Sequence, residues 1–271
     1  MSEIKTVWAA EPDQDMHTAA EEARKTFKYF WRELSWEARR IIPGLNLAAV
    51  KVAFATDDKS EGTPSVEHMW IGDVQFDGET VSGSLLNTPR WTSGIKEGDL
   101  VRVPLAEIGD WMYALMNDVY GGFSVDVMRR NMSAAERKQH DDAWGLEFPT
   151  PGMVRVVPPP KAKKEGMLSK LFGKKTAEAE PVSEEIGEHP MSENMAEKIE
   201  EALQKQPEAF MKVDAEGWTL LQRDALAGNY TPVALMLKHG ADAQACNPQG
   251  KTALDLARKM GWPRIVALLG G

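Results

Sequence analysis

The sequence predicts an α+β N-terminal domain, an antiparallel sheet with flanking helices, followed by a short all-α repeat stack. Two observations favour this division. A helical pattern is followed by strand patterns and another helix, without the regular alternation of a βαβ fold. Near the C-terminus, a motif recurs after 33 residues, which is typical of stacked helical repeats. We expect the domain over residues 1–148, a flexible charged linker over 149–190, and about two and a half repeats over 191–271.

The first predicted element is an amphipathic helix over residues 16–40 that ends at Pro43-Gly44. Its apolar side chains recur at steps of three and four residues, so they share one face. They are Ala20, Ala23, Phe27, Phe30, Leu34 and Ala38.

Strand patterns follow this helix. Residues 67–76 and 79–86 flank the turn dipeptide Asp77-Gly78, which indicates a hairpin. Further strands are expected over residues 51–55, 100–104 and 108–115.

The domain then returns to helix. Gly121-Gly122 is a permissive break in the backbone. Ser133 and Glu136 form a capping-box pattern, which predicts a helix reaching about Trp144.

The repeat is carried by glycines, a threonine and apolar residues. When residues 217–235 are aligned with residues 250–268, seven of 19 positions are identical. The pattern Gly250-x-Thr252-x-Leu254-x-x-Ala257-x-x-x-Gly261 resembles the ankyrin repeat. We expect Thr219 and Thr252 to cap the first helix of each pair, and Gly228 and Gly261 to break the chain between the paired helices.

Several positions depart from the ankyrin pattern. The usual Pro-Leu-His after the threonine reads Leu220-Leu221-Gln222 in one repeat and Ala253-Leu254-Asp255 in the other. Asp224 stands where the inner helix normally carries a small residue, and Trp262 replaces a polar loop residue. So short a stack is also expected to lean on the first domain or on a partner.

The ankyrin resemblance implies a partner-binding surface on the turn tips and the inner helices. Here that surface would comprise Glu216, Trp218, Gln222, Gln249, Lys251 and Asp255. Trp218 is a candidate anchor for a partner, because aromatic side chains dominate interface energetics. The alternative is that Trp218 packs between the repeats.

Residues 18–146 resemble the YegJ-like bacterial domain of unknown function. The resemblance rests on the motifs Glu22-Ala23-Arg24-Lys25-Thr26-Phe27, Glu67-His68-Met69-Trp70-Ile71, Gly98-Asp99-Leu100-Val101-Arg102-Val103-Pro104, Ile108-Gly109-Asp110-Trp111-Met112-Tyr113 and Gly121-Gly122-Phe123-Ser124. This family implies a fold unit and no particular chemistry.

The residues themselves give little sign of catalysis. Glu67 and His68 are neighbours on a predicted strand and should point to opposite faces, and Asp110 more often ends a strand than acts in chemistry. The chain has no nucleophile elbow, Walker loop or dinucleotide fingerprint, and its five histidines lack metal-ligand spacing. We therefore expect a protein that is not an enzyme, with no cofactor and no metal.

The charge of the chain restricts the class of partner, and its cysteine content bears on its location. Residues 1–158 carry 17 basic and 25 acidic side chains, which favours basic protein partners over nucleic acid or anionic membranes. The single cysteine, Cys246, excludes an intramolecular disulfide and suits a cytoplasmic location. The sequence shows no signal peptide and no run long enough to span a membrane.

The resulting hypothesis is a cytoplasmic, non-catalytic protein that binds another protein. Its sharpest version is an immunity protein that neutralises a bacterial toxin or effector, such as a nuclease of a type VI secretion system. Two alternatives stay open: a general interaction adaptor with two partners, and a small-molecule-sensing or enzymatic N-terminal domain.

Overall fold

A computed structural model describes residues 14–57, 60, 63–159 and 187–270. Within them, one antiparallel sheet has the strand order β4-β3-β2-β1-β5-β6. Its strands are β1 (Leu45–Ala55), β2 (Val66–Phe76), β3 (Thr80–Leu85), β4 (Leu100–Pro104), β5 (Asp110–Leu115) and β6 (Asp118–Gly121). The domain's helices are α1 (Gln14–Glu37), η1 (Leu105–Glu107), α2 (Phe123–Arg130) and α3 (Ala134–Trp144). An α+β domain with an antiparallel sheet is confirmed.

The C-terminal region is helical. Its elements are α4 (Pro190–Asn194), α5 (Ala196–Lys205), α6 (Pro207–Met211), α7 (Leu220–Ala227), α8 (Tyr230–Lys238), α9 (Ala253–Met260) and α10 (Pro263–Gly270). Helices α7 and α9 start 33 residues apart, and each is capped by the predicted threonine in a full capping box. Gly228 and Gly261 end these helices in the left-handed conformation that glycine adopts readily.

Several element boundaries differ from the expectation. Helix α1 begins two residues earlier and ends three earlier than predicted, and β1 starts six residues before the predicted strand. The sequence reasoning missed β6 and α2. Both are short, and α2 has only eight residues, too few for a clear helical period. The capping box of Ser133 and Glu136 at α3 is confirmed.

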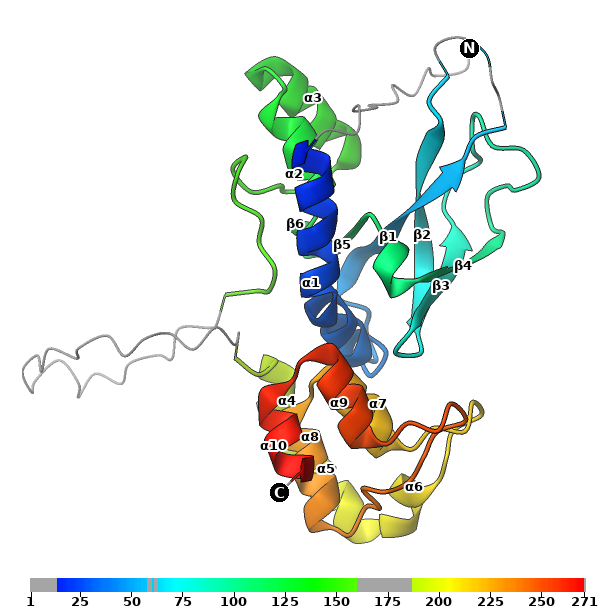
Figure 1. Cartoon of the computed structure of the whole chain (residues 1–271). Coiled ribbons are helices and arrows are strands. Elements are labelled where there is room, and N and C mark those ends of the chain that lie inside the picture. Colours follow the sequence, from blue (N-terminus) through cyan, green and yellow to red (C-terminus); the bar gives the residue numbers. More distant parts are fainter. Residues whose placement is uncertain (1–13, 58–59, 61–62, 160–186, 271) are drawn as a thin grey trace, which may run out of the picture.

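Helix α1 lies along one face of the sheet, and its C-terminal end reaches the helical region (Figure 1). The ring centroid of Phe27 lies 5.1 Å from that of Phe76, and the centroid of Phe30 lies 5.6 Å from that of Trp111. The Trp111 indole N–H donates to the carbonyl of Ala23 at 2.8 Å. Aromatic side chains of the predicted apolar stripe therefore form the core beneath α1.

Two of the departures from the ankyrin pattern, Asp224 and Trp262, lie where α1 meets the helical region. The Asp224 carboxylate is buried and accepts from Arg39 at 2.5 Å and from Asn229 at 2.7 Å. Asn229 in turn accepts the indole N–H of Trp36 at 2.8 Å. A buried carboxylate that would be costly in an isolated repeat thus has a cationic partner and an amide donor at this joint.

Trp262 fills the same joint. It is 2% exposed, and its ring centroid lies 5.7 Å from that of Tyr29. Its indole N–H donates to the carbonyl of Leu226 at 3.1 Å. A Cβ added to Gly228 would lie 2.3 Å from the Trp262 ring, so only glycine admits the indole here. The expectation that the helical region leans on the first domain agrees with these contacts.

The predicted linker is partly folded at both ends, while residues 160–186 lie outside the described part of the chain. At its start, Arg155 bonds to Asp118 at 2.8 Å and its carbonyl accepts from Gly121. The other end joins both domains, because the carbonyl of Gly187 accepts from Arg32 of α1 and the Glu188 carboxylate accepts from Thr231 of α8.

His189 adds further contacts between this segment and α1. It is buried, with its ring stacked on Trp36 at 5.8 Å, and its Nε2 lies 2.9 Å from Glu33 Oε2. Its Nδ1 accepts the N–H of Met191, so Nε2 is the atom that donates to Glu33.

Replacing Trp262 tests whether the two domains unfold as one unit. We expect Trp262→Ala to lower the free energy of unfolding by roughly 3–5 kcal/mol, the usual cost of removing a buried tryptophan. Urea unfolding followed by circular dichroism should show one transition for the wild type and two for the variant. Trp144→Ala, in the partly exposed tryptophan of α3, is the control and should keep one transition. Two transitions in the wild type would contradict a shared core.

Candidate functional site

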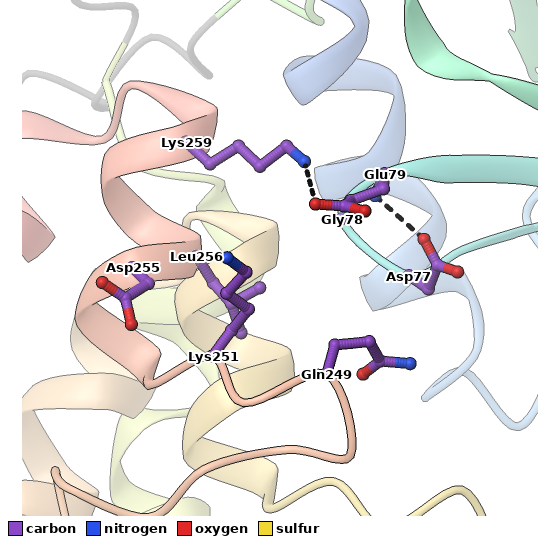
Figure 2. Close-up of a pocket in the computed structure, with 8 residues that line it drawn as sticks. All are labelled: Asp77, Gly78, Glu79, Gln249, Lys251, Asp255, Leu256 and Lys259. Atoms are coloured by element: carbon purple, nitrogen blue, oxygen red, sulfur yellow. Dashed lines mark hydrogen bonds and ion pairs between the residues drawn. The ribbon is translucent and has the colours of Figure 1, made fainter.

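A cleft of about 270 Å³ lies between the β2–β3 turn and the second helical repeat, which here means α9 and the turn before it. Figure 2 shows the eight residues that line it. They are Asp77, Gly78 and Glu79 from the turn, and Gln249, Lys251, Asp255, Leu256 and Lys259 from the repeat. The cleft therefore draws its walls from both domains.

The wall from the first domain is the predicted Asp77-Gly78 turn. Asp77 Oδ1 accepts the backbone N–H groups of Glu79 and Thr80 at 2.9 and 2.7 Å, which fixes the turn. Gly78 has φ +93°, and a Cβ there would lie 3.2 Å from the Leu256 side chain. Glycine thus allows the tip of the hairpin to rest on the inner helix α9.

Hydrogen bonds also hold the opposite wall, which is formed by α9 and the turn before it. The buried Asn247 accepts the N–H groups of Gln249 and Lys251 at 3.1 and 2.8 Å, which shapes the turn before α9. Asp255 accepts both the N–H and the hydroxyl of Thr252, at 3.0 and 2.8 Å. These hydrogen bonds hold the pKa of the Asp255 carboxyl below its ordinary value.

The cleft carries both signs of charge. Lys259 Nζ and Glu79 Oε1 form an ion pair at 3.0 Å that bridges the two walls. The ammonium of Lys251 has no ion pair among the described residues, and Leu256 adds apolar surface. The cleft therefore presents charged, amide and apolar groups side by side.

Three of the six residues that the ankyrin resemblance assigned to partner contacts line this cleft: Gln249, Lys251 and Asp255. Glu216 is exposed on the preceding turn, where it pairs with Arg223. Their role in binding a partner stays a prediction.

Trp218 and Gln222 do not belong to an exposed surface. Trp218 is 2% exposed and Arg223 lies over its ring at 4.5 Å, so the alternative of packing within the repeats describes its position. Gln222 is 1% exposed; it completes the capping box of Thr219 and donates to the carbonyl of Ala245 at 2.8 Å. The resemblance placed both residues on the partner-binding surface because a sequence pattern does not show that local hydrogen bonds and packing already use them.

Sequence reasoning missed the cleft residues Asp77, Gly78, Glu79, Leu256 and Lys259. The turn dipeptide gave a signal for the hairpin, but nothing in the sequence places that hairpin against a helix about 180 residues later.

Two of the catalytic candidates, Glu67 and Asp110, accept backbone hydrogen bonds. Glu67 is buried and accepts the N–H groups of Arg90 and Trp91, while His68 faces the other side of β2. Asp110 is fully buried and accepts backbone N–H groups of Trp111, Phe123 and Ser124. In the described part of the chain, no three His, Cys, Asp or Glu residues are grouped to hold a metal ion. No helix described there is long and apolar enough to cross a membrane.

The fold and the cleft define a two-domain protein in which an α+β domain and a helical region share one joint. Residues 13–148 match the family described as "Uncharacterized protein conserved in bacteria (DUF2314)". The chain therefore belongs to the DUF2314 family.

Two known proteins are similar to this chain. The chain is 37% identical over 269 residues to "Putative ankyrin repeat protein NMB1133/NMB1171" of Neisseria meningitidis serogroup B, covering 99% of this chain and 98% of that protein. It is 30% identical over 62 residues to "Uncharacterized protein YegJ" of Escherichia coli, covering 23% of this chain and 40% of that protein. No solved structure matches the chain.

The Asp255 carboxylate should support the repeat only while it is ionised. Because its folded pKa is lowered, its stabilisation is present above the unfolded pKa of about 3.9 and is lost as pH falls through the lower folded value. We expect Asp255→Asn to lower the urea midpoint at pH 6 and to have a smaller effect at pH 3. Asp242→Asn, in an exposed turn outside the cleft, is the control. An equal loss for Asp255→Asn at both pH values would contradict this account.

Proposed function

We propose that this chain is a non-catalytic protein-binding protein and that its helical region is an ankyrin-type stack. The observation that carries the proposal is the cleft between the hairpin and the second repeat, where Gln249, Lys251 and Asp255 come together. The ankyrin reading is supported by the 33-residue spacing of the threonine-capped helices and by the printed name of the Neisseria relative.

An exposed apolar loop next to the joint also supports the proposal that this chain binds a protein. Ile41 is 100% exposed and Ile42 is 80% exposed, although both are large aliphatic residues. Their loop is held in place, because Arg39 pairs with Asp224 and the Glu37 carboxylate accepts the N–H groups of Gly44 and Leu45. Two exposed isoleucines on a fixed loop offer a partner apolar contact at little entropic cost.

The finer proposal is that the partner is a bacterial toxin or effector and that this chain is its immunity protein. The acidic balance of residues 1–158 supports a basic partner, such as a nuclease, because complementary charge speeds association and favours the correct partner. Neutralisation would then follow from physical cover of the toxin's active surface and would need no catalysis.

Affinity capture from the native cell tests the binding proposal. We expect the tagged chain to retain a stoichiometric partner, and Ile41→Asp or Lys251→Glu to weaken that complex by roughly tenfold or more, as for anchor residues at interfaces. Lys205→Glu, on the exposed face of α5, is the matched control because it makes the same charge change outside the cleft. Equal retention by all four proteins would remove the cleft and the loop from the interface.

A growth assay tests the immunity version separately. Proteins encoded beside this chain's own gene are expressed with and without it. Rescue of growth by the wild type, and loss of rescue with Ile41→Asp, is the expected result. Capture of several substoichiometric partners without rescue would instead favour an adaptor.

A further inference from the structure

The sheet face opposite α1 carries an unusual group of side chains. In the strand register, Lys51 of β1 pairs with Trp70 of β2 and with Asp110 of β5, and the next position on this face pairs Ala53 with His68. Residues paired across neighbouring strands project from the same face. Lys51, Trp70 and His68 therefore lie together on the face that α1 does not cover.

Asp110 is already satisfied without Lys51. Its Oδ1 accepts the N–H groups of Trp111 and Phe123 at 2.8 and 3.1 Å. Its Oδ2 accepts the N–H and the hydroxyl of Ser124 at 2.8 and 2.7 Å. Four donors fill the acceptor sites of this carboxylate, which fixes the start of α2.

Lys51 is therefore a half-buried cation without a closely paired opposite charge among the described residues. Its ammonium donates to Ser124 Oγ at 3.0 Å and lies 5.8 Å from the centroid of the Trp70 ring. Among the described residues it has no ion pair within 4.0 Å. Burial therefore lowers the pKa of Lys51, and the more distant Asp110 offsets this only in part. Partial burial, and then the charge of Lys51, lower the pKa of His68.

We propose that Lys51, His68 and Trp70 form a binding site for a small organic carboxylate. A carboxylate beside Lys51 would supply the counter-charge that this desolvated ammonium lacks, and two of its three N–H donors have no protein acceptor among the described residues. The Trp70 ring, which is half-buried, would pack against the apolar body of the ligand. The imidazole of His68 would donate a second hydrogen bond.

This site is independent of the proposed protein interface. None of its residues lines the cleft, and it lies on strands of the first domain alone. The carboxylate could belong to a free small molecule or to an acidic side chain of a polypeptide, and both sources present the same chemistry to Lys51.

Binding is tested on the full chain by NMR and calorimetry, with benzoate and acetate as probes. We expect benzoate to shift the Trp70 indole and His68 ring signals and to bind more tightly than acetate, because acetate has no ring to pack on Trp70. Trp70→Leu should remove that advantage, and Lys51→Met should weaken benzoate binding by about tenfold or more, the usual scale for a charge-assisted hydrogen bond. Arg102→Gln, an exposed cation on β4 of the same face, is the matched control and should bind as the wild type does.

Thermal unfolding without ligand separates a binding role from a structural one. If Lys51 is kept for a ligand, Lys51→Met should raise the melting temperature, because it removes an uncompensated charge from a half-buried site. A lowered melting temperature, or benzoate shifts that survive in Lys51→Met, would overturn the proposal. Binding of a glutamate-rich peptide in place of benzoate would keep the site and assign its source to a polypeptide.

Discussion

Helix α1 has to satisfy two cores at once, and the arrangement of the whole molecule depends on this. One side of the helix carries Phe27 and Phe30, which pack against the aromatic side chains of the sheet. Another side carries Tyr29 and Trp36, which contact Trp262 and Asn229 of the helical region. Because the two sets of rings project from one helix into different domains, a shift of α1 that improves one contact surface disturbs the other.

The same constraint also determines how the helical region is covered. A helical repeat buries its apolar face only against a neighbour, and the ends of a stack normally need polar caps. Here the hairpin tip at Gly78 lies against α7 and α9, and the C-terminal end of α1 lies against α7. The first domain thus covers one side of the helical region, and the cleft lies between the hairpin and α9.

The local features were predictable from sequence, and their assembly was not. Threonine caps, the Asp77-Gly78 turn and the stripe around Phe27 follow from rules that act within a few residues. Asp224 and Trp262 could be recognised as departures from the repeat, but their cause is contact with α1, which lies far away in the sequence. Five of the eight cleft residues were missed, and the three from the hairpin were missed for the same reason, since the hairpin reaches the cleft through tertiary packing. The burial of Trp218 and Gln222 likewise depends on neighbours that a repeat pattern does not specify.

The contacts made by residues 187–189 should keep the two domains associated after the backbone before them is cleaved. Gly187, Glu188 and His189 are fastened to α1 and α8, so the helical region does not rely on the covalent connection before it for its position. A chain cleaved between residues 160 and 186 would yield two fragments that still bring Trp36 together with Asn229 and Tyr29 together with Trp262. The protein is therefore suited to being produced as complementing halves, whose reassembly would report on the joint directly.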